Sequence, residues 1–369
     1  MEQPVFVYGP LRDGEMRLLV LGPGGARHAT PARLPGQVAV AAGPLAALRA
    51  ADGCAEGLVL TVAAAARARL DGFAAQLGYR AIQTKVETDQ GPAAVTLYRA
   101  AEDPPADAAP WDLQIWAARD KPLVLQMARE VSAYPDAGAA PLGLLRRAVA
   151  RLRAAEGAPA ALRSDFGDGV LTDHRVTRTH AGFFAGEVHR FRHRRFGGDL
   201  SPEVNREVFV TGDAVSVLPW DPRRDSVLLI EQIRSGLIAR GDPNPMNLEV
   251  IAGICDRNED PTATARREAR EEAGLDLGRI VEVGRYYTSP GALTEFVIGF
   301  LAEADLGDVT TGIFGLDTEH EDIRRLVVPR REAMAALARG EARNAPLILS
   351  LLELERRADG LAAEWARVG

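Results

Sequence analysis

Residues 253–275 read GICDRNEDPTATARREAREEAGL, and the spacing within this stretch decides how the C-terminal half of the chain folds. Gly253 is followed after five residues by Glu259, and seven further residues lead into the run REAREEAGL at 267–275. Seven of its polar or glycine positions stand at set intervals, and apolar residues occupy the positions where a helix would face inward. If each fixed residue occurs at roughly 5–10%, a chance match at one start position has a probability of about one in ten million. The stretch therefore predicts one specific loop-and-helix unit.

The second half of this stretch predicts a helix that carries a group of carboxylates. Pro261 is favoured at the first helical position, and Gly274 is suited to the left-handed cap that ends a helix. Glu268 precedes Glu271 by three residues and Glu272 by four, so these side chains lie near one helix face. Like charges at this spacing repel, and hard oxygen ligands of this kind suit Mg²⁺ or Mn²⁺. Divalent ions held there would neutralise a pyrophosphate and activate water.

A helix rich in glutamate and arginine has a simpler explanation as well. Arg266, Arg267 and Arg270 alternate with the acidic residues, as on a solvated surface helix with many salt bridges. The complete spacing from Gly253 to Leu275 favours the metal-binding interpretation, because a surface helix has no need for it.

The pattern resembles the Nudix box, the signature of hydrolases that cleave nucleoside diphosphates linked to another group. The resemblance implies catalytic roles for Glu268, Glu271 and Glu272. It also implies that the Ala252 carbonyl, Glu268 and Glu272 are metal ligands. The expected cofactor is Mg²⁺, with Mn²⁺ as a substitute.

Length and composition favour a globular protein of two domains. The chain has 369 residues, of which 47% are hydrophobic and 26% charged. A net charge of −7 offers no basic surface for nucleic acid, and no apolar run approaches the ~20 residues of a membrane span. Cys54 and Cys255 form no metal or redox motif, and the sequence has no signal peptide, so we expect a cytoplasmic protein with a small-molecule substrate.

The N-terminal part opens with the strand pattern PVFVY, which runs into a turn at Gly9-Pro10. This part resembles the γ-glutamylcyclotransferase-like (AIG2-like) fold, in which backbone amides of the corresponding loop hold the ligand. The resemblance assigns this role to Tyr8, Gly9, Pro10 and Leu11. Ala74 stands where the family carries its catalytic glutamate and cannot move a proton, so we expect a degenerate binding or interaction module.

The predicted fold class is α/β, with a C-terminal Nudix α/β/α sandwich on a mixed sheet, preceded by this α+β domain. The predicted boundaries are 1–156 for the N-terminal domain, 157–172 for a linker, 173–358 for the Nudix domain and 359–369 for a C-terminal tail.

From about residue 172 onward the sequence resembles the ADP-ribose pyrophosphatase branch of the Nudix hydrolases. The resemblance implies substrate contacts at Phe183, Phe184, Arg206, Glu207, Arg234, Ile254, Ser289, Pro290 and Gly291. The arginines would clamp phosphate or ribose, and the phenylalanines would stack on adenine where a partner subunit closes over it. The alternative explanation is a surface charge for the two arginines, core packing for the two phenylalanines and a simple turn for residues 289–291. The branch usually forms homodimers by exchanging strands, so we expect a homodimer.

The acidic run at 317–322 reads DTEHED. The resemblance assigns the general base to Glu319 and a further metal ligand to Glu321, because the box carboxylates are engaged by metal. A solvated acidic loop is the simpler alternative.

Together these features predict Mg²⁺-dependent hydrolysis of ADP-ribose, or a related nucleoside diphosphate sugar, to AMP and ribose 5-phosphate. Two other functions stay open. One is a γ-glutamyl cyclotransferase with a regulatory Nudix domain, and the other is a non-catalytic sensor of ADP-ribose or a related nucleotide. The fused arrangement also resembles bacterial proteins associated with tellurite resistance, although no residue in the sequence indicates a tellurium site.

Overall fold

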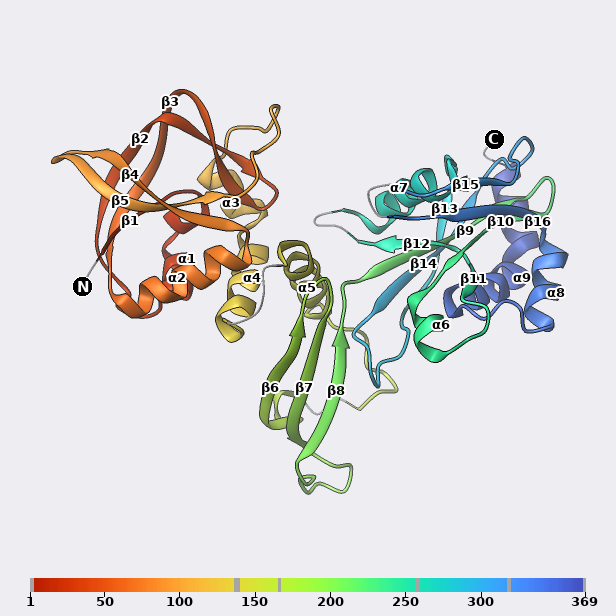
Figure 1. The fold of residues 1–369 in the computed structure, drawn as a ribbon. Coiled ribbons are helices and arrows are strands. Elements are labelled where there is room, and N and C mark those ends of the chain that lie inside the picture. The colour runs from red at the N-terminus through yellow and green to blue at the C-terminus, as the bar shows by residue number, and fades with distance from the viewer. Residues whose placement is uncertain (1–2, 136–139, 165–166, 256–258, 317–319, 368–369) are drawn as a thin grey trace. The chain divides into compact units, whose positions relative to one another are not determined.

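The computed structural model describes residues 3–135, 140–164, 167–255, 259–316 and 320–367. The chain forms two compact units, Met1–Val210 and Thr211–Gly369, which are considered separately below (Figure 1).

The first unit begins with a small closed β-barrel. Its strands follow the order β1-β3-β2-β4-β5. They are β1 (Gln3–Val7), β2 (Ala26–Ala42), β3 (Leu45–Val62), β4 (Tyr79–Thr88) and β5 (Gly91–Ala100). Helix α2 (Ala64–Gln76) follows β3 along the chain.

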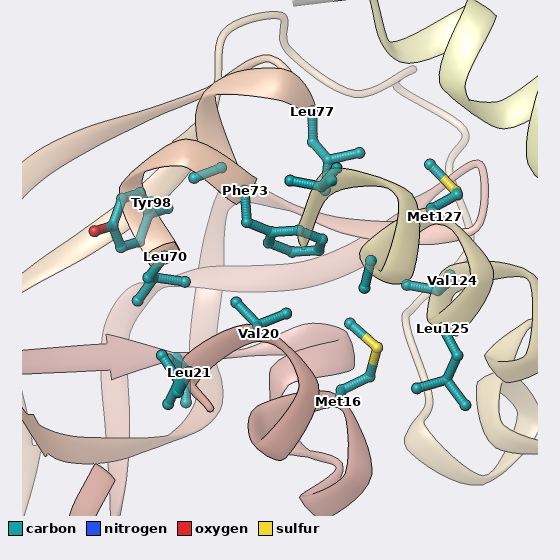
Figure 2. Close-up of a cluster of buried hydrophobic side chains, with 14 of the residues drawn as sticks. Met16, Val20, Leu21, Leu70, Phe73, Leu77, Tyr98, Val124, Leu125 and Met127 are labelled. Carbon is teal, nitrogen blue, oxygen red and sulfur yellow. The ribbon is translucent and has the colours of Figure 1, made fainter. Parts of the chain in front are cut away.

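Helices pack beside the barrel and share one apolar core with it. They are η1 (Gly9–Arg12), α1 (Gly14–Leu21), α2, α3 (Leu113–Arg119) and α4 (Lys121–Ala133). Figure 2 shows side chains from α1, α2 and α4 that converge on this core, among them Met16, Phe73 and Met127. Burial of these side chains is the main force that holds the helices to the barrel.

The rest of the first unit is α5 (Pro141–Ala154), η2 (Gly167–Gly169) and a sheet of β6 (Leu171–Ala181), β7 (Ala185–His193) and β8 (Val204–Val210). A buried ion-pair network joins these strands to the helices. Glu130 of α4 accepts from Arg147 Nε at 2.7 Å and from Arg178 Nη1 of β6 at 2.9 Å. Arg178 Nη2 also donates to Glu187 of β7 at 2.5 Å. Residues 173–210, grouped with the C-terminal domain in the sequence-based division, therefore pack with the first compact unit.

The second unit is built on one mixed sheet whose main path runs β13-β14-β9-β10-β16-β15. Its strands are β9 (Ala214–Asp221), β10 (Ser226–Ile233), β11 (Met246–Glu249), β12 (Ile251–Ile254), β13 (Ile280–Tyr287), β14 (Phe296–Glu303), β15 (Gly312–Phe314) and β16 (Ile323–Pro329). β14 runs parallel to β9, and the other strand pairs of this sheet are antiparallel within the described residues.

Helices cover both faces of this sheet. Ala265, Ala269 and Ala273 of α7 (Pro261–Ala273) pack with Val215 and Val217 of β9 on one face. The other face, with Leu218 and Trp220 of β9, packs against α8 (Arg330–Ala338) and α9 (Ala345–Ala366). A short helix, α6 (Ser235–Arg240), follows β10. The predicted α/β/α sandwich on a mixed sheet is confirmed.

Within the described residues, none of the helices combines the length and apolar character that crossing a membrane would require.

Candidate active site

Helix α7 begins and ends where the sequence predicts. Asp260 is the N-cap, and its Oδ1 accepts a hydrogen bond from the Thr262 amide at 2.8 Å. Pro261 is the first helical residue, and Gly274 closes the helix with a left-handed φ of +59°. The Leu275 amide then donates to the Ala269 carbonyl at 3.0 Å. These caps set the rotation of the helix and therefore which side chains face the sheet.

The alanine face of α7 lies on the sheet, so Glu268 and Glu272 are carried towards strand β12. Glu272 is 3% exposed, and its Oε2 accepts from the Ala252 amide at 3.1 Å. Glu268 stands against Gly253 so closely that a Cβ on that glycine would lie 1.9 Å from Glu268 Oε1. The structure thus brings together Ala252, Glu268 and Glu272, all proposed metal ligands.

One arginine partly neutralises the acidic group. Arg267 Nη1 donates to Glu268 Oε1 at 2.8 Å and to Glu271 Oε2 at 2.9 Å. Its Nη2 donates to Glu259 Oε2 at 3.2 Å. The arginine thus ties the box glutamate of the loop to the carboxylates of the helix. The sequence does not show these partners of Arg267, since its contacts depend on the loop returning to the helix.

The negative charge that remains on this group of carboxylates disfavours their ionised form. Burial, with the charges of Glu271 and Glu321, raises the pKa of Glu268 to about 7 even though Arg267 lowers it. Burial also raises the pKa of Glu272 well above its ordinary value, and Glu268 and Glu321 add to this rise. Buried carboxylates that repel each other are stabilised by a cation, so this donor set fits a divalent ion.

Glu321 belongs to the same electrostatic group. Its Oε2 accepts from the Leu316 amide at 3.1 Å, which holds the carboxylate beside the chain that leads into the acidic loop. Glu319, the predicted base, lies outside the described residues. Within the described parts of the chain, no group of three or more His, Cys, Asp or Glu side chains is placed so that it could hold a metal ion.

Arg234 lies immediately after β10 and is held in place by a buried carboxylate. Its Nε donates to Glu249 Oε1 at 2.9 Å, and its Nη2 donates to Glu249 Oε2 at 2.6 Å. Asn247 Nδ2 also donates to Glu249 Oε1, at 2.7 Å. Burial alone would lower the pKa of Arg234, but Glu249, Glu272 and Glu321 raise it, which places the arginine in the field of the acidic group.

Glu249 and Asn247 belong to this arrangement although the sequence alone does not single them out. The signal was present as polar residues at alternate positions of MNLE, which lie on one face of a strand. Which face is buried depends on the strand pairing.

The other C-terminal candidates are less constrained. Ile254 ends β12, opposite Ala214, and is half-buried. Ser289, Pro290 and Gly291 are exposed and form a turn closed by the Leu293 amide, which donates to the Ser289 carbonyl at 2.8 Å.

Comparison with known proteins shows which families the two parts of the chain resemble. Residues 210–351 match the family model described as "NUDIX domain", and residues 5–117 match "Gamma-glutamyl cyclotransferase, AIG2-like". An ADP-ribose pyrophosphatase of Escherichia coli K12 is 42% identical over 189 residues, which cover 51% of this chain and 88% of that relative. The chain belongs to the Nudix hydrolase family.

Further relatives of this Nudix hydrolase differ in their named substrates. An ADP-ribose pyrophosphatase of Haemophilus influenzae is 34% identical over 190 residues, covering 51% of this chain and 87% of the relative. A GDP-mannose pyrophosphatase of Cronobacter sakazakii is 36% identical over 152 residues, covering 41% of this chain and 78% of the relative.

The aromatic candidates of the Nudix hydrolase lie in its first unit. The Phe183 and Phe184 rings meet edge to face at a centroid distance of 4.7 Å, and Phe183 is 48% exposed. The Arg146 guanidinium lies 4.9 Å from the centre of the Phe183 ring. Arg206 and Glu207 are exposed on β8. An exposed aromatic face is available to a ligand, and the assignment of these residues to substrate stays a prediction.

The AIG2-like barrel contains a cavity of about 60 Å³. Tyr8, Pro10 and Leu11 of the predicted ligand loop line it, and so does Ala74 of α2. Gly9 has a φ of +58°, and a Cβ there would lie 2.5 Å from the Ala46 Cβ, so the loop requires glycine at this position. No carboxylate is among the described residues that line this cavity.

Proposed function

We propose that this Nudix hydrolase cleaves the pyrophosphate of ADP-ribose, or of a related nucleoside diphosphate sugar, to AMP and ribose 5-phosphate. The observation that carries the proposal is the pair of Glu268 and the buried Glu272 against the Ala252–Gly253 backbone, with the pKa of each carboxyl raised by burial and by neighbouring carboxylates. The name shared by the relatives at 42% and 34% identity supports ADP-ribose as the substrate.

The proposed metal ligands are Glu268, Glu272, Glu321 and the Ala252 carbonyl. When bound, Mg²⁺ or Mn²⁺ would neutralise the pyrophosphate and lower the pKa of a water molecule. Nudix hydrolases generally use such a divalent ion.

The protein's own side chains would position the substrate and remove a proton from the attacking water. Arg234, held by Glu249, orients a phosphate of the substrate through its planar guanidinium. Glu319, proposed as general base, accepts the proton of the attacking water. The water oxygen bonds to one phosphorus as the bond from that phosphorus to the bridging oxygen breaks.

The remaining contacts complete the proposed site. Glu207, Ile254 and the turn at 289–291 would contact the sugar and base. Arg206 would bind phosphate or ribose, and Phe183 with Phe184 would stack on adenine in a homodimer. For the AIG2-like barrel we propose a binding role without cyclotransferase chemistry, because Ala74 replaces the acid. A cytoplasmic location and the connection to tellurite stay predictions.

Product analysis tests the proposal. Purified protein is incubated with Mg²⁺ and, separately, ADP-ribose, GDP-mannose, NADH, ADP-glucose and diadenosine polyphosphates. We expect AMP and ribose 5-phosphate from ADP-ribose, and no product after chelation of the metal with EDTA. Glu272→Gln should reduce kcat by about 10³-fold or more, because it removes a charged ligand from the proposed ion.

The variant Glu319→Gln distinguishes a role in proton transfer from a role in substrate binding. It should lower kcat and leave KM nearly unchanged, whereas normal turnover would remove Glu319 from this role. Tight binding of ADP-ribose without cleavage in Mg²⁺ would replace the hydrolase with a sensor. Release of 5-oxoproline from γ-glutamyl peptides would favour a cyclotransferase instead.

A further inference from the structure

Gln232, near the end of β10, carries a buried amide nitrogen that has no hydrogen-bond partner among the described residues. The residue is 7% exposed. Its Nε2 is inaccessible to solvent and forms no hydrogen bond within the described part of the chain. Buried polar groups are almost always paired, so this donor requires an explanation.

The alternation of β10 shows which way Gln232 faces. Leu228 and Ile230 pack into the core beneath α7, whereas Val227 and Leu229 pack into the core on the opposite face. Because side chains alternate along a strand, Gln232 shares the face of Ile230, on the α7 side of the sheet.

The neighbours of Gln232 on that face belong to the candidate active site. Gln232 pairs with Asn247 across the β10–β11 ladder, and Ile230 pairs with Glu249. Arg234 follows two residues after Gln232 and binds Glu249. The Asn247 amide also donates to Glu249, so this carboxylate is already shared by both neighbours. Gln232 is therefore the member of this polar row whose amide nitrogen is left without an acceptor among the described residues.

We propose that Gln232 is a substrate-contacting residue whose Nε2 donates a hydrogen bond to a pyrophosphate oxygen, beside the phosphate bound by Arg234. This inference rests on the proposed function. An anionic oxygen is the acceptor best matched to the position, because the neighbouring cation Arg234 attracts the same group. The fold then leaves a donor unpaired in the free enzyme that becomes paired when the substrate binds.

Gln232→Met tests this contact, because methionine has a similar length and shape but no donor. We expect kcat/KM for ADP-ribose to fall by about 10- to 100-fold, as for loss of one hydrogen bond to a charged group. The same variant should keep or increase Tm, since it removes a buried donor that lacks a partner. A purely structural role for Gln232 predicts the opposite pair of results: lower Tm and unchanged kcat/KM.

Two further variants sharpen the test. Gln232→Glu keeps the shape but turns a negative charge towards the pyrophosphate, and it should lower kcat/KM more than Gln232→Met does. Gln37→Met is the matched control, because Gln37 Oε1 in the barrel is also buried without a hydrogen bond among the described residues. It should leave kcat/KM unchanged.

The failure of this inference is distinguishable from failure of the proposed function. If the wild-type enzyme hydrolyses ADP-ribose and Gln232→Met has normal kcat/KM, the contact is wrong and the function stands. If the wild-type enzyme cleaves no member of the panel, the function is wrong. Calorimetry with inorganic pyrophosphate and Mg²⁺ then decides the contact: weaker binding by Gln232→Met supports it, and equal binding overturns it.

Discussion

A methyl group placed at Gly253 should disable this enzyme without unfolding it. Gly253 lies within β12, paired with Val215, and its φ is outside the left-handed region, so alanine can adopt the same backbone. The new Cβ would lie 1.9 Å from Glu268 Oε1 and 2.0 Å from its Cδ. The flexible end of Glu268 is thus the part that must move.

The size of that movement follows from the geometry. An ordinary van der Waals contact begins at 3.4 Å, so Glu268 Oε1 has to move about 1.5 Å away from the new Cβ. A misplacement of roughly 1 Å in a catalytic arrangement can reduce the rate by about 10²-fold. We therefore expect Gly253→Ala to lower kcat/KM for ADP-ribose about 10²-fold and to raise the Mg²⁺ concentration needed for half-maximal activity.

The assay is steady-state release of AMP across a Mg²⁺ titration, with thermal unfolding measured in parallel. Gly284→Ala is the control, because Gly284 lies in β13 and an added Cβ there meets no atom within 4 Å. The Tm of Gly253→Ala should stay within about 4 °C of the wild type, equivalent to roughly 1 kcal/mol. Wild-type kcat/KM and Mg²⁺ dependence in Gly253→Ala would refute the role of the Glu268 position.

Two further predictions concern the first unit. Burial alone would raise the pKa of Glu187, but Arg178 and Arg151 lower this pKa below its value in the unfolded chain. The ionised Glu187 therefore stabilises the folded unit above the unfolded pKa of about 4.3, and this stabilisation is lost as pH falls through the folded pKa. Glu187→Gln should thus destabilise the first unit by about 3–5 kcal/mol at pH 7 and flatten the acid limb of its denaturant-unfolding profile; an unchanged acid limb would contradict this. Ala74→Leu should fill part of the barrel cavity of about 60 Å³ and raise stability by about 0.5–2 kcal/mol with Nudix turnover unchanged, whereas a lower Tm would show that the cavity cannot accept the added carbons.

The sequence by itself determined the elements whose signals are local. The ends of α7 at Pro261 and Gly274 follow from capping preferences that act within one helical turn. The 3- and 4-residue spacings of the helix glutamates likewise place Glu268 and Glu272 on one face before any tertiary contact is known.

Tertiary structure decided which polar groups find partners. Glu249, Asn247 and Gln232 lie on neighbouring strands, and only the β10–β11 register shows that the first two are bonded while the Gln232 Nε2 has no partner among the described residues. The association of the strands at 171–210 with the first unit likewise depends on the buried contacts between Arg178 and Glu130. Such pairings join residues far apart in the chain, and their stability comes from burial, which no local pattern encodes.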